Sequence, residues 1–205
     1  MSSNTIAQGE ISEETMAMEA QVFEILNAIY LHKMATISHV GDVTVLGEEV
    51  VEAALSGEER AGMVLSFDGS YLLQEAGTAK VLDYYNRKYA ALRAGGGIVQ
   101  WYERFESSLN QQFIKAVSEW QVSDGDSRAR DKMAKLVERM IRQLSQIVEA
   151  VPRYKKYATR FERAMARADR GEVDYVCKPT VDSMHNIWFE FHEDILAVVG
   201  RPRDV

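Results

Sequence analysis

Apolar residues recur at every third or fourth position over most of the chain, which is the pattern of amphipathic helices. On this spacing we predict a first helix over 13–34 and another over Ala76–Leu92. Four more helices are expected further along the chain, over 98–121, 128–150, 154–168 and 181–199. Gly95-Gly96-Gly97 interrupts the pattern, and three successive glycines favour a hinge. The pattern therefore predicts a mainly α protein with two domains, residues 13–94 and 98–205.

One stretch breaks the helical spacing and predicts a β-hairpin. Met63–Phe67 and Ser70–Leu73 are runs of residues that favour strands, and Asp68-Gly69 joins them. An Asp-Gly pair between two such runs supplies the positive φ angles of a tight hairpin turn. We therefore expect a small two-stranded hairpin within an otherwise helical chain.

Two short helices are predicted directly before this hairpin. Thr36 is a suitable N-cap for a helix through Val40, and Val45-Leu46-Gly47 makes a turn. The next helix, over Glu48–Leu55, carries apolar residues that suit one buried face, and Gly62 marks its end before the first strand.

Residues 34–77 therefore read as helix, turn, helix and hairpin, and this order resembles the winged helix-turn-helix of MarR-like and PadR-like transcription regulators. The resemblance covers roughly residues 18–94 and rests on order and spacing. It implies that the helix after the turn recognises DNA, that the hairpin is the wing, and that the protein binds DNA as a homodimer. The C-terminal helical domain would then serve dimerisation or ligand sensing. Winged helices also act as protein-protein modules, so an interaction protein or accessory subunit that has lost DNA binding is the alternative.

The distribution of charge works against the DNA-binding interpretation. The net charge is −7, but residues 1–95 hold six Lys or Arg and fourteen Asp or Glu, a net charge of −8, whereas residues 96–205 hold eighteen and seventeen, a net charge of +1. DNA-binding domains are usually basic. Around the expected recognition helix, Arg60 stands alone among five glutamates, and the wing tip holds Asp68 instead of Arg or Lys. The remaining candidate DNA contacts are Ser38, His39, Thr44, Ser56, Arg60 and Ser66.

A second candidate site is a line of cations in the helix that follows Pro152. Successive members are three or four residues apart, which places them on one side of a helix. They are Arg153, Lys156, Arg160, Arg163, Arg167 and Arg170. We call these six residues the basic stripe. Like charges one turn apart repel, so the stripe suggests an anionic partner: DNA phosphate, an anionic ligand, an acidic protein surface or the acidic half of the same chain. The alternative is an ordinary solvated helix face.

The last predicted helix contains residue types that bind metals, namely Asp182, His185 and His192. The two histidines are seven residues apart, which is two helical turns and too far for a single site. We therefore expect histidines hydrogen-bonded to neighbouring helices, with no metal and no other cofactor. No nucleophile elbow or phosphate-binding loop is found either, so we expect no catalytic residues and no enzymatic activity.

Further features bear on where the protein works. No apolar run approaches the roughly 18 residues that a membrane helix needs. The first residues, 1–12, are polar and acidic, unlike a secretory signal, and we expect a loose tail there. Cys177 is the only cysteine, which leaves no intrachain disulfide. These features predict a cytoplasmic protein that does not enter a membrane.

The expected helices over 98–121 and 128–150 have apolar faces that are too wide to be covered by each other alone, and two-fold pairing would bury the remainder. We therefore predict a homodimer at micromolar concentration, to be measured by light scattering. A mass equal to one 23.2 kDa chain would contradict this prediction.

Overall fold

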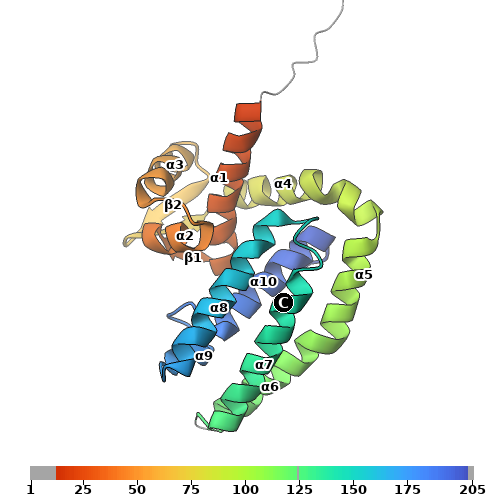
Figure 1. Cartoon of the computed structure of the whole chain (residues 1–205). Helices are drawn as coiled ribbons and strands as arrows, with labels where there is room; N and C mark the ends of the chain where they lie inside the picture. The colour runs from red at the N-terminus through yellow and green to blue at the C-terminus, as the bar shows by residue number, and fades with distance from the viewer. Residues whose placement is uncertain (1–12, 124, 203–205) are drawn as a thin grey trace, which may run out of the picture. The chain divides into compact units, whose positions relative to one another are not determined.

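The computed structural model describes residues 13–123 and 125–202, and it is mainly helical with one three-stranded antiparallel sheet (Figure 1). The chain forms two compact units that divide between Val81 and Leu82, inside helix α4 (Glu75–Ala94). The glycine run at 95–97 lies within the second unit, where Gly95 and Gly96 separate α4 from α5 (Gly97–Arg104). The expected loose tail at 1–12 lies outside the described residues.

The first unit contains the predicted helix, turn, helix and hairpin. Its elements are α1 (Glu13–His32), β1 (Met34–Thr36), α2 (Ile37–Thr44), α3 (Glu48–Arg60), β2 (Val64–Phe67) and β3 (Ser70–Leu73). The strand β1 is an addition to the prediction. Lys33 has a positive φ of 71° and ends α1 two residues early, so that the next three residues are extended.

Local chemistry explains why these elements begin and end where they do. The Thr36 hydroxyl accepts a hydrogen bond from the His39 amide at 3.2 Å, which confirms the predicted N-cap of α2. Asp68 and Gly69 have φ angles of 49° and 75°, as the predicted hairpin turn requires. At the start of α4, a β-carbon on Gly77 would lie 2.0 Å from the carbonyl oxygen of Met63, so only glycine fits there.

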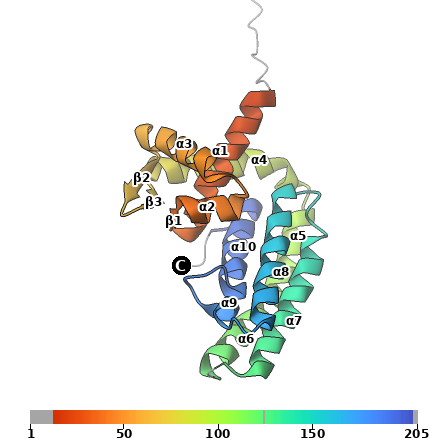
Figure 2. The ribbon, with the colours of Figure 1, turned by 60° about the vertical axis from the view of Figure 1, so that its left-hand side comes forward.

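The sheet has the strand order β1-β3-β2, with both pairs antiparallel. Ala35 and Val64 are buried, on the side of the sheet that belongs to the core of this unit. Helices α1, α2 and α3 supply the rest of that core, with Ile25, Leu26, Ile29, Val40, Val51 and Leu55 all buried. Figure 2 shows these three helices beside the sheet.

The second unit contains helices and no strand among its described residues. After α4 and α5 come the π-helical segment η1 (Phe105–Asn110), α6 (Gln111–Val122) and α7 (Ser127–Leu144). A 3₁₀ turn, η2 (Pro152–Tyr154), leads into α8 (Lys155–Asp169), and α9 (Asp174–Cys177) precedes α10 (Met184–Val199). The predicted helix over 98–121 is thus one run of helix with a π-helical turn in its middle.

Two predicted boundaries in this unit are wrong. The helix predicted over 128–150 ends at Leu144, and turns follow it to residue 150. The last helix begins at Met184 and not at Val181, because Ser183 caps it by accepting a hydrogen bond from the Asn186 amide at 3.3 Å. The four-residue helix α9 was not predicted.

Helix α10 is buried along most of its length and forms the centre of the second unit. Its aromatic residues Trp188 and Phe191 contact rings from α6, η1, η2 and α8, among them Phe105, Phe113, Tyr154, Tyr157 and Phe161. Helices α6 and α8 of the same chain pack against α7, whose apolar face is buried. We expected a second copy of the chain to bury the remaining apolar surface of α7, but α8 of the same chain buries part of it. The homodimer stays a prediction.

Across residues 13–123 and 125–202, none of the helices has both the length and the apolar character needed to cross a bilayer.

Candidate functional site

The solvent-facing side of α3 is dominated by carboxylates. Glu48, Glu49, Glu52 and Glu59 are all exposed there. Glu48 and Glu49 lie in the first turn, where negative charge is favoured by the helix dipole, so they also stabilise α3. Arg60 is the only cation of this helix, and its Nε donates to the Ser56 carbonyl oxygen at 3.1 Å. We call the four exposed glutamates the acidic face.

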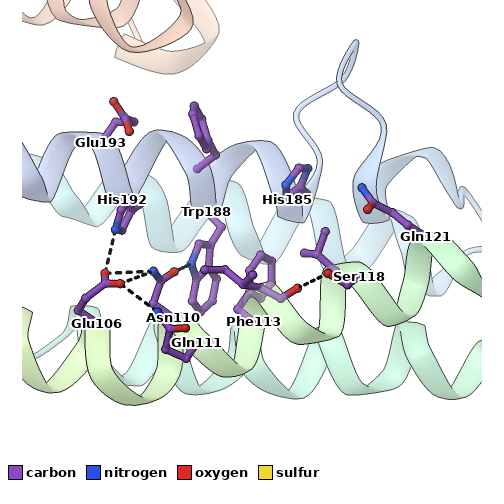
Figure 3. Close-up of a pocket in the computed structure, with 13 residues that line it drawn as sticks. Glu106, Asn110, Gln111, Phe113, Ser118, Gln121, His185, Trp188, His192 and Glu193 are labelled. Atoms are coloured by element: carbon purple, nitrogen blue, oxygen red, sulfur yellow. Dashed lines mark hydrogen bonds and ion pairs between the residues drawn. The ribbon is translucent and has the colours of Figure 1, made fainter. Parts of the chain in front are cut away.

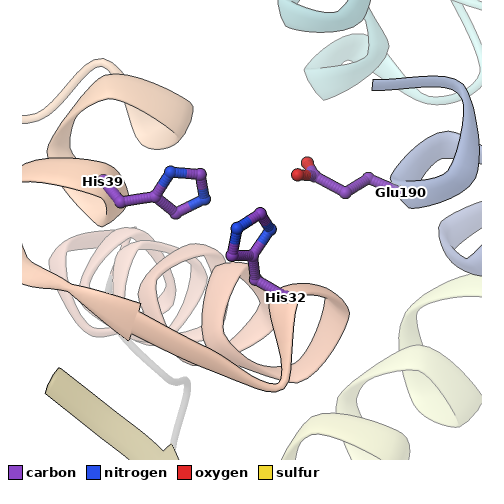
Figure 4. Close-up of side chains that lie close together, drawn as sticks. All are labelled: His32, His39 and Glu190. Atoms are coloured by element: carbon purple, nitrogen blue, oxygen red, sulfur yellow. The ribbon is translucent and has the colours of Figure 1, made fainter. Parts of the chain in front are cut away.

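The six candidate DNA contacts do not all present free side chains. Ser38, Ser56, Arg60 and Ser66 are exposed, whereas His39 and Thr44 are half-buried. The Thr44 hydroxyl donates to the Val40 carbonyl oxygen at 2.6 Å. The His39 ring lies with its centroid 3.9 Å from that of the His32 ring (Figure 4). Both therefore have partners within the first unit.

The outer edge of β2 is closed by side chains. The Ser66 amide, which points away from β3, donates to Oε1 of Glu59 at 3.1 Å. Nε2 of Gln74 donates to the Val64 carbonyl oxygen at 3.3 Å. A further strand could pair here only by displacing both side chains, which is a common protection of sheet edges. Addition of a further strand at the β2 edge is therefore disfavoured.

The sheet face opposite the core is apolar, and the sequence analysis missed it. Met34 is paired with Leu72, and Leu72 is paired with Leu65, so the three side chains lie in a row on one face. Phe67, two residues after Leu65, is on the same face. Met34, Leu65 and Phe67 are 51%, 47% and 66% exposed. We call these four residues the apolar sheet face. The unbroken run Met63-Val64-Leu65 was the available clue, because neighbouring strand residues point to opposite faces.

The basic stripe of the second unit does not form one solvent-facing line, which corrects the prediction. Arg160 is only 1% exposed, and the Arg153 side chain is 10% exposed. Arg153 precedes α8 and lies in the 3₁₀ turn η2, so it departs from the helical register on which the stripe was drawn. Lys156 is half-buried over the Tyr157 ring, while Arg167 and Arg170 pair with Glu172. Arg163 is exposed.

Arg153 forms a buried ion pair with Asp194 at the centre of the second unit. Both terminal nitrogens of its guanidinium contact the carboxylate, and its Nε donates to the Tyr89 hydroxyl at 3.1 Å. Asp194 also accepts hydrogen bonds from Tyr85, Tyr154 and Tyr157 at 2.9, 3.2 and 2.9 Å. Burial alone would raise the pKa of Asp194, but the positive charge and hydrogen bonds of Arg153 hold that pKa below its usual value. We call this group the Arg–Asp–Tyr network.

Arg160 belongs to a second ion-pair group. Its Nη2 lies 2.7 Å from Asp182, and its Nη1 lies 2.7 Å from Glu190. Burial would lower the pKa of Arg160, but the two carboxylates outweigh this effect and raise it. These contacts give Arg160 a position inside the unit, so it is not available to an anionic partner.

The three metal candidates do not come together among the residues that the structure describes. Asp182 pairs with Arg160, and Nε2 of His192 lies 2.8 Å from Oε2 of Glu106. His185 is half-buried, and desolvation lowers its pKa. The expectation of histidines that contact neighbouring helices is met by His192, which lies on α10 and contacts η1.

A pocket of about 470 Å³ lies beside this histidine (Figure 3). It is lined by α10 on one side and by η1 and α6 on the other. Nε1 of Trp188 donates to Oδ1 of Asn110 at 2.8 Å, and Nδ2 of Asn110 donates to both carboxylate oxygens of Glu106 at 3.1 and 3.0 Å. With His192 these residues form a continuous polar chain along one wall. The sequence analysis noticed His185 and His192 but not the pocket, because the π-helical turn could not be read from spacing.

Comparison of the chain with protein-family models, with curated proteins and with solved structures found no match. Any function must therefore be inferred from the residues themselves.

Our prediction here concerns the Arg–Asp–Tyr network. Asp194→Asn removes the charge that pairs with buried Arg153, and leaving such a charge unpaired costs about 3–5 kcal/mol of unfolding free energy. This loss of unfolding free energy can be measured by urea unfolding monitored by tryptophan fluorescence, since Trp101, Trp120 and Trp188 all lie in the second unit. Asp169→Asn, an exposed aspartate of α8, is the matched control and should change little.

The pH dependence provides a second readout of the same variants. Because the pKa of Asp194 is lowered in the folded protein, its stabilisation is present above the ordinary aspartate pKa of about 3.9 and is lost as the pH falls through the lower folded value. Wild type should lose stability in this acidic range more steeply than Asp194→Asn. The Asp169→Asn control retains Asp194 and should follow the wild-type profile. Parallel pH profiles for wild type and Asp194→Asn, or a control profile as flat as that of Asp194→Asn, would contradict a central role for the pair.

Proposed function

We propose that this chain is an interaction protein whose first unit is a winged helix-turn-helix scaffold that binds a basic protein surface in place of DNA. The observation that carries the proposal is the acidic face at the position of the recognition helix. The order α1, β1, α2, α3, β2, β3 and the tight turn at Asp68-Gly69 support the winged helix. The second unit is proposed to be an all-helical accessory part of the same protein.

The electrostatics of α3 disfavour a DNA duplex. Duplex DNA carries one negative charge about every 1.7 Å along its axis, and affinity comes largely from Lys and Arg that neutralise phosphates. Four exposed glutamates on α3 would repel such a surface, and Arg60 is hydrogen-bonded back to its own helix. At the wing tip, exposed Phe67 and Asp68 occupy positions where Arg or Lys would reach a groove.

The same features suit a protein partner with both cationic and apolar residues. Lys and Arg of the partner would pair with the acidic face, and apolar residues would cover the apolar sheet face. Glu59 lies at the junction of the two surfaces, because it belongs to α3 and its carboxylate contacts β2. Charge complementarity of this kind raises association rates and selects the partner.

A DNA-binding transcription regulator is the second candidate, and one observation favours it: the element order is that of winged regulators. In that case Asp68→Lys should strengthen binding and steepen its salt dependence, because each added phosphate contact releases counterions.

Our prediction is that the wild-type protein does not bind duplex DNA. Fluorescence anisotropy of a labelled random-sequence duplex of about 30 base pairs, at about 20 mM salt, should not change up to tens of micromolar protein. Asp68→Lys should not create binding either, because the acidic face remains. Saturable binding by wild type that weakens steeply with salt would overturn the proposal in favour of a regulator.

A further inference from the structure

A second site is independent of the proposed function and lies in the pocket between η1, α6 and α10. We propose that this pocket binds a small molecule that combines an apolar, planar body with a protonated amine, and that Glu106 receives the amine. The proposal rests on the π-helical turn, the charges of the lining, its apolar floor and the fixed position of Glu106.

The π-helical turn coincides with the polar wall of the pocket. Segment η1 spans Phe105–Asn110, and both Glu106 and Asn110 lie within it. π-helical turns are rare, occur mostly as single turns inside α-helices, and are frequently found at functional sites. Here the turn allows Asn110, which is 3% exposed, to reach Trp188 of α10 while holding Glu106.

The charges of the lining select against anions. Among the described residues that line the pocket there are two carboxylates, Glu106 and Glu193, and no Lys or Arg. The two histidines are His185 and His192. Desolvation lowers the pKa of His185, which favours its uncharged form near neutral pH. Apart from His192, which already contacts Glu106, the lining offers a carboxylate or phosphate ligand no cationic side chain, whereas an ammonium group would find a carboxylate.

The apolar part of the lining suits a planar body. The rings of Phe113 and Trp188 stack on each other, with centroids 3.8 Å apart and planes only 3° from parallel, and both are almost fully buried. The half-exposed ring of Phe189 is therefore the one on which a planar body can stack. Ile114, Val117 and Phe189 extend the apolar lining, and Ile114 and Phe189 are about half exposed. A volume of about 470 Å³ falls within the range of small-molecule pockets, and mainly apolar walls with a few placed polar groups are typical of them.

Glu106 is held in place before any ligand arrives. Asn110, Gln111 and His192 all contact its carboxylate, yet its side chain remains 28% exposed. Asn110 is fixed in turn by the Trp188 indole. A carboxylate whose rotamer is locked by a second layer of hydrogen bonds loses little entropy on binding, which is how precise binding sites are built. The indole nitrogen of Trp188 also gives a reporter within two hydrogen bonds of Glu106.

The experiment is a titration of the ¹⁵N-labelled full chain with matched probes, followed at the indole resonances of its three tryptophans. The probes are 2-naphthylmethylamine and 2-naphthoate, which share a ring system and differ in charge. We expect the amine to shift the Trp188 resonance saturably and to bind at least about tenfold more tightly than the carboxylate. One charge-assisted hydrogen bond is sufficient for an affinity difference of this size. The Trp120 resonance should be unaffected, since Trp120 does not line the pocket.

Two variants test the role of Glu106. Glu106→Gln keeps the shape of the side chain and should remove the preference for the amine, while leaving weak binding of the ring system. Glu138→Gln, an exposed glutamate of α7 outside the pocket, is the control and should retain the preference. Equal affinity of both probes for wild type, an amine preference that survives Glu106→Gln, or a Trp188 resonance that neither probe moves at millimolar concentration would each overturn the proposal.

Discussion

The buried pair of Arg153 and Asp194 is the interaction on which the second unit depends. It joins the 3₁₀ turn η2 to α10, and tyrosines from α4, η2 and α8 complete the shell of the carboxylate. Removing two charges from water is costly, and only a nearly complete set of hydrogen bonds offsets that cost. A packing that separated η2 from α10 would leave both charges buried and unpaired, so the pair favours the observed arrangement over such alternatives.

Helix α10 makes polar contacts on two opposite sides. On one side, Asp194 pairs with Arg153 of η2, and Glu190 pairs with Arg160 of α8. On the other side, Trp188 contacts Asn110 and His192 contacts Glu106, at the polar wall of the pocket. Because Asp194 and His192 are two residues apart on one rigid helix, the network that anchors α10 also sets the position of the pocket wall. The C-terminal end of α10 is held similarly, since Arg93 donates to the carbonyl oxygens of Ala197 and Val198.

The sequence was sufficient for features that depend on local chemistry. Thr36 as an N-cap and Asp68-Gly69 as a hairpin turn were predicted because each needs only its neighbouring residues. Features that depend on distant partners were not predicted. Arg160 was placed on a surface stripe because its partners, Asp182 and Glu190, are far away in sequence. The π-helical turn and the three-residue strand β1 were missed because neither is long enough to alter a periodic pattern. The apolar sheet face was missed because Leu65 and Phe67 were read only as evidence for a strand.

The acidic face of α3 is proposed to recognise a basic protein. Zero-length cross-linking tests this proposal, because it joins a carboxylate only to an amine in contact with it. It would be applied to nuclease-treated extract containing the full chain at its natural level. We expect peptides holding Glu48, Glu49 or Glu52 to be joined to lysines of one other protein, and these links to vanish when the three glutamates are changed to glutamine. Links from Glu138 and Asp169 that are as abundant as those from α3 would contradict the proposal. So would the absence of links from α3, together with the finding that nuclease treatment releases this protein from DNA.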